Sequence, residues 1–354
     1  MRILHAIRSD EFSGVEQFVR RLAIEQASVG HQVHVIGGDP ALMRAPLNAR
    51  GVGFTPATRT LEVSRAVRRL HRHVDVVNTH MTAADVGAVF GLSAVRSRPA
   101  IVATRHFAQP RGRVGRVPID ALVRQRIDAE ISVSKAVAAA IGVDSTVVHP
   151  GVEPRPQSSP ALRTRAVLIA QRLQPEKATS HGIRAFAESG LAQRGWFLNV
   201  AGEGAERESL EALARQLGIG DATRFIGFRT DLPSLMESAG VLLAPCPFEH
   251  FGLTVVEAMA SALPIVAADA AGHREMLSGL DPRALFTPGD VSAAAGQMSS
   301  LAADEPGRAA LGRAERERQN QDFSLSAQAN GTEKVYSAAL ARRRSATQTF
   351  EAPE

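Results

Sequence analysis

Short apolar runs of strand length alternate with segments of helical periodicity along most of this chain. The first cycle is the run from Ile3 to Ile7, a helical segment from Val15 to Ala27 and a second run from Val33 to Ile36. In the helical segment, apolar residues recur at spacings of three and four, which places them on one face that can be buried. Strands that alternate with helices in this way predict an α/β fold with parallel sheets.

The alternation is interrupted once and then restarts. The break, Pro150 to Thr164, is rich in proline and serine and cannot continue a helix or a central strand. Further expected helices are 61–71, 83–95, 135–141 and one near 181–189, and further expected strands are 74–78, 100–104, 129–133, 146–149, 166–170, 196–201, 223–227, 241–244 and 264–268. We therefore predict two Rossmann-like domains facing across a cleft, 1–154 and 155–326, with a helix at about 327–343 packing back on the first.

Composition excludes several classes of protein. The 354 residues, 44% hydrophobic and 22% charged, indicate a folded protein rather than a disordered one. The single cysteine, Cys246, excludes an internal disulfide framework and a cysteine-built zinc site. The first residues lack the apolar core of a signal peptide, and the stretch from Met81 to Val95 is shorter than the roughly 18 apolar residues of a membrane span. These features predict a cytoplasmic protein.

Positive charge is concentrated in the first half. There are 20 basic against 12 acidic residues up to Val152, and 21 against 24 after it. Arg65, Arg68, Arg69 and Arg72 fall on about one face of an expected helix, but no aromatic residues are interleaved for base stacking, so nucleic-acid binding is disfavoured. Instead we expect an anionic or membrane-associated acceptor, with peripheral contact at the inner face of the membrane. A solvated arginine face is the open alternative.

Two common nucleotide-binding motifs are absent. Residues 8–14 after the first expected strand read Arg-Ser-Asp-Glu-Phe-Ser-Gly, which is not the glycine-rich fingerprint of dinucleotide binding. No Walker A lysine motif occurs either. A nicotinamide dehydrogenase and a P-loop kinase are therefore disfavoured.

The most informative motif places two carboxylates around a glycine turn. Glu249 precedes the turn at Gly252, and Glu257 lies one to two turns into the helix that follows. The free N–H groups of Gly252, Leu253 and Thr254 would form an anion site suited to phosphate. Both carboxylates could accept hydrogen bonds from sugar or ribose hydroxyls. The alternative is that they are ordinary surface charges.

Cations and histidines follow other expected strands. Arg172 and Lys177 come after the first strand of the second domain and could clamp a diphosphate, although a surface cluster is an equal interpretation. Gly14 begins the first helix, where backbone can approach a ligand closely. His80 and His106 stand at the carboxyl ends of neighbouring strands, so both are expected to point toward the cleft.

Taken in order, these motifs resemble glycosyltransferase family 4, the retaining nucleotide-sugar transferases of GT-B fold. The resemblance runs from about Gly14 to Tyr336. Its motifs are Gly14-Val15-Glu16, Arg105-His106-Phe107, Ile131-Ser132-Val133 running into Ser134-Lys135, Pro150-Gly151-Val152, Arg172 with Lys177, Ala201-Gly202-Glu203-Gly204, Phe225-Ile226-Gly227-Phe228, and Glu249 with Glu257. The ordered set is far more specific than any single motif.

The resemblance implies transfer of a hexosyl-type sugar, with retention, from a UDP or GDP donor to a hydroxyl of a glycan, lipid-linked or small-molecule acceptor. It implies no cofactor and no metal. The catalytic residues it implies are His106 beside the reacting sugar, Glu249 on the transferred sugar, and Arg172 and Lys177 on the diphosphate. The other donor-binding groups it implies are the amides of Gly252, Leu253 and Thr254, the carboxylate of Glu257 on the ribose, Gly14 in the first loop, and backbone near Phe228 and Arg229 at the base.

For the acceptor we expect His80 and three arginines after His106, namely Arg111, Arg113 and Arg116. The chain departs from the family pattern at Ser13, His149, Ala178 and Ala271, but none of these departures removes a charged binding residue. Two other functions remain open on the same fold: a non-catalytic nucleotide-sugar-binding scaffold and a sugar-nucleotide epimerase.

Overall fold

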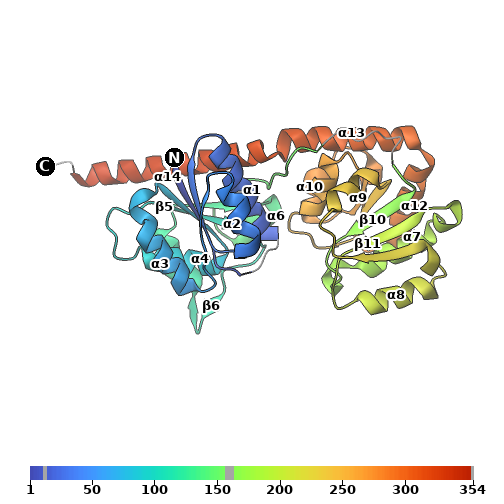
Figure 1. Cartoon of the computed structure of the whole chain (residues 1–354), viewed down its shortest axis with the longest axis horizontal. Helices are drawn as coiled ribbons and strands as arrows, with labels where there is room; N and C mark the ends of the chain where they lie inside the picture. The colour runs from blue at the N-terminus through green and yellow to red at the C-terminus, as the bar shows by residue number, and fades with distance from the viewer. Residues whose placement is uncertain (11–13, 156–162, 352–354) are drawn as a thin grey trace. The chain divides into compact units, whose positions relative to one another are not determined.

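The computed structural model, drawn in Figure 1, describes residues 1–10, 14–155 and 163–351. It divides into an N-terminal unit, Met1–Gly151 with Leu325–Glu354, and a C-terminal unit, Val152–Ser324. The boundaries expected from the sequence, 154/155 and 326/327, lie two or three residues from these divisions. Each unit contains its own parallel sheet, and each is described separately below.

The N-terminal unit is built on a seven-stranded parallel sheet of order β3-β2-β1-β4-β5-β8-β9. Its strands are β1 (Arg2–Ile7), β2 (Gln32–Ile36), β3 (Gly53–Thr55), β4 (Val76–His80), β5 (Ala100–Arg105), β8 (Ala129–Ser132) and β9 (Thr146–Val147). The order reverses between β1 and β4, and ligands of open α/β sheets bind at such a reversal, beyond the carboxyl ends of the strands. A two-stranded antiparallel hairpin, β6 (Arg113–Val114) and β7 (Val117–Pro118), projects from the loop after β5.

Helices cover both faces of this sheet. They are α1 (Gly14–Ser28), α2 (Pro40–Asn48), α3 (Thr60–Leu70), α4 (Thr82–Gly91), α5 (Ile119–Val123), α6 (Lys135–Ile141) and the C-terminal α14 (Leu325–Glu351). Helices α3 and α4 lie side by side in Figure 1, and a Cβ on Gly91 would come within 2.5 Å of the Ser64 carbonyl oxygen. Helix α14 packs on α1, β5 and β8, as the sequence predicts for a returning C-terminal helix.

The C-terminal unit has a six-stranded parallel sheet of order β12-β11-β10-β13-β14-β15. Its strands are β10 (Ala166–Ala170), β11 (Phe197–Ala201), β12 (Thr223–Gly227), β13 (Val241–Ala244), β14 (Ile265–Ala268) and β15 (Leu285–Phe286). The order reverses between β10 and β13, so this unit repeats the Rossmann-like pattern of the first. Its helices are α7 (Thr179–Glu188), α8 (Arg207–Gln216), α9 (Leu232–Ser238), α10 (Leu253–Ala260), α11 (Ala271–Leu277), α12 (Val291–Ala303) and α13 (Glu305–Asp322).

The predicted fold is confirmed: two Rossmann-like units alternate strands and helices as the periodicity indicated. Helix α2 was missed because it carries prolines, yet Pro40 occupies its first turn and Asp39 caps it by accepting from the Ala41 N–H. Within the described part of the chain, no helix combines the length and apolar character needed to cross a membrane.

Candidate functional site

The loop after β10 carries both cations expected to bind a diphosphate. Arg172 is exposed and forms a 3.5 Å ion pair with Glu176, also exposed. Lys177 ends a single 3₁₀ turn, and Ala178 follows it with φ of 50°, in the left-handed conformation that glycine favours. The departure from the family's glycine therefore adds backbone strain but keeps the left-handed turn.

Lys177 meets Glu249, although the two are far apart in sequence. The Lys177 Nζ donates to Glu249 Oε2 at 2.7 Å, and each side chain is 19% exposed. Burial by itself would raise the pKa of Glu249, but the charge and hydrogen bond of Lys177, together with smaller effects of His273 and His250, outweigh burial and the pKa is lowered. The carboxylate is therefore charged at neutral pH. The structure thus joins two motifs that the sequence analysis considered separately.

Gly272, which follows β14, holds the Glu249 loop in place. The Glu249 carbonyl accepts from the Gly272 N–H at 3.0 Å. A Cβ on Gly272 would lie 2.3 Å from the Phe251 carbonyl oxygen, so the backbone approach requires glycine here. At Ala271, the family's other glycine position, α11 begins without a positive φ. This departure therefore leaves the packing of the Glu249 loop unchanged.

The start of α10 offers backbone N–H groups to a ligand. Gly252 precedes the helix with φ of 102°, and no side chain caps this end within the described residues. Leu253 and Thr254 are half-buried, and the first N–H groups of an α-helix have no acceptor within the helix. Such a terminus favours an anion. Glu257 lies in the same helix and is buried, with 9% of its surface exposed.

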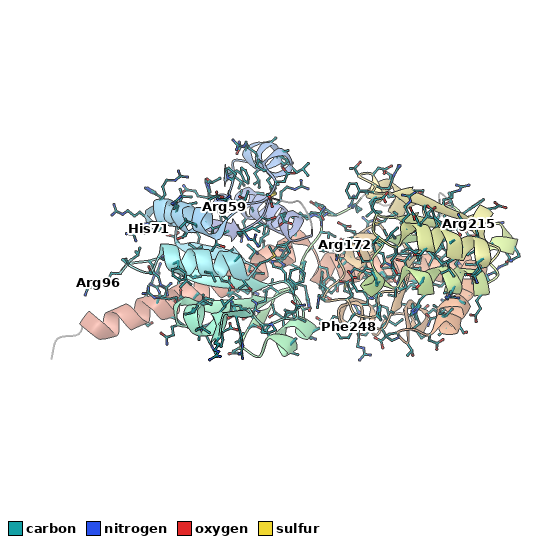
Figure 2. The ribbon with its side chains drawn as sticks, turned by 90° about the horizontal axis from the view of Figure 1, so that it is seen from below. Arg59, His71, Arg96, Arg172, Arg215 and Phe248 are labelled. Carbon is teal, nitrogen blue, oxygen red and sulfur yellow. The ribbon has the colours of Figure 1, made fainter. Side chains whose placement is uncertain are left out.

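Two exposed phenylalanines mark other loops at this edge. Phe228 follows β12 and is 77% exposed, and Phe248 directly precedes Glu249 and is 83% exposed. Arg229, the other residue expected near the base, forms an exposed ion pair of 2.6 Å with Asp231. Figure 2 shows Arg172 and Phe248 at one edge of the C-terminal unit and Arg215 of α8 at the opposite edge.

Two residues of this site were missed from the sequence. Cys246 is buried, its Sγ lies 3.5 Å from the Glu176 carbonyl oxygen, and burial raises its pKa against the effect of Lys177. His273 is buried beside Gly252, with its Nδ1 3.0 Å from the Ala268 carbonyl oxygen. Because that carbonyl only accepts, Nδ1 carries the proton. Both residues follow the end of a strand, and that position in the sequence could have marked them as candidates for the site.

The two histidines that the sequence analysis singled out in the N-terminal unit, His80 and His106, lie together at the carboxyl ends of β4 and β5. His80 Nδ1 is 3.1 Å from His106 Nε2. His106 is half-buried, but His80 is fully buried. The expectation that both rings point toward a ligand is therefore wrong for His80, which supports His106 from behind. His80 is held there by its hydrogen bonds to other rings, since a buried imidazole needs polar partners.

The first turn of α1 lies against His106. Gly14 begins the helix, and Ser13, one of the departures noted above, falls outside the described residues. The Phe18 ring meets the His106 ring edge-on, with centroids 4.8 Å apart. Burial lowers the pKa of His106 to about 4, although Glu16, buried in the same helix, acts in the opposite direction. His106 is therefore neutral at pH 7.

Arg111, which was expected to contact the acceptor, is buried instead. Its side chain is fully buried, and it donates to three carboxylates, those of Asp85 at 2.6 Å, Asp120 at 2.6 Å and Glu130 at 3.0 Å. A guanidinium enclosed in this way holds the loop after β5 and is not available to an acceptor. The other two arginines, Arg113 and Arg116, are exposed on the β6–β7 hairpin.

Comparison with known families now decides what these units are. A family described as Glycosyltransferase Family 4 matches residues 12–156, and one described as Glycosyl transferases group 1 matches residues 153–318. The chain belongs to glycosyltransferase family 4. The resemblance carried by the ordered motifs is thereby confirmed.

Curated relatives share part of this glycosyltransferase. Glycogen synthase of Mycobacterium tuberculosis is 32% identical over 187 residues, 52% of this chain and 44% of that protein. The 2-deoxystreptamine glucosyltransferase of Streptomyces kanamyceticus is 28% identical over 268 residues, 74% of this chain and 65% of that protein. The matches thus span less than two thirds of the length of either relative.

Solved structures confirm the GT-B fold. HepE of Anabaena in complex with UDP superposes with a TM-score of 0.79 at 21% identity, over 96% of this chain and 100% of that one. Sucrose-phosphate synthase of Thermosynechococcus elongatus gives 0.72 at 19% identity, over 97% and 100%. At these identities the likeness concerns the fold alone.

Proposed function

We propose that this glycosyltransferase moves a hexosyl-type sugar, with retained anomeric configuration, from a UDP or GDP donor to an acceptor hydroxyl. The observation that carries the proposal is the Lys177–Glu249 ion pair beside the uncapped start of α10. One carboxylate, one ammonium and a set of backbone N–H groups lie at the reversal between β10 and β13. A sugar diphosphate presents hydroxyls and an anion, which these groups complement.

Each group has a role that follows from its chemistry. Lys177 and the exposed Arg172 neutralise the diphosphate, and the amides of Leu253 and Thr254 add donors. The charged Glu249 accepts from hydroxyls of the transferred sugar. Glu257, together with backbone near Phe228, holds the nucleoside, and the neutral His106 hydrogen-bonds the sugar. No metal is required, because the cations and amides stabilise the leaving group.

In the transfer step, the bond between the anomeric carbon and the diphosphate oxygen breaks and its electron pair stays on the diphosphate. A bond forms between the same carbon and the acceptor oxygen, on the same face of the sugar. The acceptor's hydroxyl proton passes to a diphosphate oxygen. Charge stabilisation of the diphosphate is then the largest catalytic contribution.

UDP-sugars are the first donors to test, because HepE was solved with UDP and with UDP-glucose. We would record thermal unfolding with UDP, GDP, ADP and their common sugar conjugates, on the wild type and on Lys177→Ala. A ligand that binds only the folded state raises the melting temperature. Lys334→Ala, on the exposed face of α14, is the matched lysine control.

A shift for one base, kept in Lys334→Ala and lost in Lys177→Ala, supports the donor site. Product NMR then reads the anomeric configuration, and an inverted product contradicts retention. Binding without transfer to any acceptor supports the scaffold alternative. Conversion of the donor into another nucleotide sugar supports the epimerase. No shift with any nucleotide contradicts the donor site itself.

For the acceptor we propose an anionic or lipid-linked glycan, held by the basic surface of the N-terminal unit. Arg65, Arg68 and Arg69 of α3 are exposed, as is Arg72 in the turn that follows. The residues that flank α3, Arg59 and His71, are labelled in Figure 2. The neighbouring apolar side chains of Leu61 and Phe90 are 58% and 59% exposed. Arginines beside apolar groups suit a membrane surface.

The test is co-sedimentation with vesicles that contain phosphatidylglycerol. Replacing Arg65, Arg68, Arg69 and Arg72 by Ser should weaken binding on the order of 1,000-fold, since each basic residue near an anionic surface contributes about 1 kcal/mol. The control replaces four exposed arginines of the C-terminal unit, Arg184, Arg194, Arg215 and Arg313. Equal losses in the two variants, or no loss in the first, contradict a specific membrane-facing surface.

A further inference from the structure

Three histidines and a glutamine form a hydrogen-bonded series inside the N-terminal unit. His106 Nε2 lies 3.1 Å from His80 Nδ1, and His80 Nε2 lies 3.1 Å from His5 Nδ1. The series ends where His5 Nε2 meets Gln26 Oε1 at 2.7 Å. We call these four residues the histidine chain. The sequence analysis considered only two of them, and the proposed function uses only His106.

The sheet itself aligns the rings. Strand β1 pairs with β4 so that Ile7 lies opposite His80, and β4 pairs with β5 so that His80 lies opposite Thr104. The three strands are neighbours at the reversal of strand order, which brings His5, His80 and His106 into successive contact. Ring centroids are 5.3 Å apart in both adjacent pairs. His5 and His80 therefore lie on strands, and His106 directly follows the last residue of β5.

The histidine chain is electrically neutral at physiological pH. Burial lowers the pKa of His5 and of His106 to about 4, and lowers the pKa of His80 well below its usual value. Glu16 is the charged group that faces His106 from α1, and its effect is smaller than that of burial. No group of three His, Cys, Asp or Glu among the described residues is arranged to hold a metal ion. The three rings contact one another and Gln26 through hydrogen bonds.

Neutrality makes the proton positions interdependent. A neutral imidazole has one N–H donor and one bare nitrogen, so fixing either nitrogen of a ring fixes the other. Gln26 Oε1 only accepts, which puts the proton of His5 on Nε2 and leaves its Nδ1 bare. The bare Nδ1 of His5 accepts from His80 Nε2, which leaves the Nδ1 of His80 bare. That nitrogen in turn accepts from His106 Nε2, so His106 carries its proton on Nε2 and its Nδ1 is bare.

We propose that the histidine chain is a positioning device: it holds His106 in the tautomer protonated at Nε2 and leaves Nδ1 to accept a hydrogen bond from a sugar hydroxyl. The tautomer of His106 follows from hydrogen bonds within the N-terminal unit alone. The sugar hydroxyl rests on the proposed function. Of the three rings, only that of His106 is partly exposed, so only this end of the series can meet a ligand.

The orientation of Gln26 decides the outcome. With Oε1 on His5, the Gln26 Nε2 is buried without a hydrogen bond of normal geometry among the described residues, although Gln26 acts on the Tyr336 hydroxyl and opposes the rise that burial causes in the pKa of that group. A reversed amide would donate to His5, and every ring would then donate in the opposite sense, so that His106 would carry its proton on Nδ1. The two orders predict opposite chemistry at the ligand, an acceptor in one case and a donor in the other.

The first experiment is long-range proton–nitrogen NMR on the full chain with nitrogen-15 in the histidine rings. His106 is assigned by the signal that disappears in His106→Phe. We expect a bare Nδ1 and a protonated Nε2 on His106 in the wild type at pH 7. A protonated Nδ1 overturns the proposal. The tautomer itself is read on the wild type without a substrate, and His106→Phe serves only for the assignment.

The second experiment removes the anchor. Gln26→Met keeps the side-chain length but has no strong acceptor, so His106 should populate both tautomers and kcat should fall about tenfold, the value of one hydrogen bond. Affinity for the nucleotide should stay within about twofold, because the donor groups lie in the other unit. Gln32→Met, at an exposed position of β2, is the matched control.

An unchanged His106 tautomer in Gln26→Met overturns the anchoring role. An altered tautomer with unchanged kcat overturns the sugar contact. If the wild type shows the expected tautomer but transfers no sugar from any donor, the proposed function fails while the ordering of the histidine chain stands. The two failures are thus distinguishable.

Discussion

The two units share one strand order, but they differ in how far their charged side chains are exposed to solvent. In the C-terminal unit, Lys177 and Glu249 form an ion pair in which both side chains are 19% exposed. In the N-terminal unit, the guanidinium of Arg111 is fully enclosed by carboxylates, and the ring that stays accessible, that of His106, is neutral. A charge that must meet a ligand keeps some access to solvent, whereas an enclosed charge serves the fold.

The largest effect should come from breaking the enclosed charge. Arg111→Met leaves the buried carboxylate of Asp85 without its cation, while Glu130 keeps its ion pair with Arg105 at 3.2 Å, and should destabilise the N-terminal unit by about 3–5 kcal/mol. Urea unfolding followed by circular dichroism measures the loss. Fluorescence of Trp196, the single tryptophan, reports the C-terminal unit and should keep its midpoint.

Arg116→Met, on the exposed hairpin of the same loop, is the matched control and should change stability by less than about 0.5 kcal/mol. Equal shifts of the dichroism and Trp196 transitions in Arg111→Met would contradict separate roles for the two units. They would show instead that the units unfold together.

The partly exposed charge should matter to activity more than to folding. Lys177→Met keeps much of the aliphatic stem but removes the cation beside Glu249, and should lower kcat/KM by about 100-fold or more, as for the loss of a donor that stabilises leaving-group charge. Steady-state kinetics with the donor found by thermal shift measures it. A fall smaller than that of Lys334→Met would remove Lys177 from the diphosphate site.

The positions of the groups that we propose to bind the donor could be predicted from the sequence because they follow strand ends. Arg172, Lys177 and Glu249 each come after an apolar run, and the parallel order of the strands brings such positions to one edge. The strands 166–170, 223–227 and 241–244 and the helix 135–141 were predicted with the bounds that the structure has. The apolar periodicity of buried elements is a strong signal.

The residues that the sequence analysis placed wrongly or missed depend on partners that lie far apart in sequence. The acceptor contact expected for Arg111 was wrong because its partners Asp85 and Glu130, which enclose it, come from a helix and a strand elsewhere in the unit. His5 was missed because one histidine in an apolar strand carries no local signal, and its partner Gln26 is 21 residues away. Pairings of this kind follow from strand order, which periodicity alone does not give.

The pH dependence of stability should differ between the units. Folding lowers the pKa of His5 to about 4 from its usual 6.5, so the unfolded chain binds more protons between these values and stability falls with falling pH. For His5 the loss from pH 7 to pH 5 is about 2 kcal/mol. His80 and His106 act in the same direction.

The C-terminal unit has one such histidine with a lowered pKa among its described residues, His273. Asp85 in one unit and Glu315 in the other have raised pKa values, which oppose the trend in both. We therefore expect the N-terminal transition to move further than the Trp196 transition when unfolding is repeated at pH 5. Equal movement would show that the neutral histidines are not what distinguishes the units.

The smallest effect should come from an ion pair whose two side chains are both largely exposed to solvent. Arg172 and Glu176 are 3.5 Å apart with side chains 71% and 57% exposed, so Glu176→Gln should change the free energy of unfolding by less than about 0.5 kcal/mol. Because Arg172 then loses a competing carboxylate, nucleotide affinity should rise by no more than about threefold. Titration calorimetry at low and high salt measures it, since screening should remove the gain. A stability loss approaching that of Arg111→Met would mean that exposure does not separate the two kinds of charge.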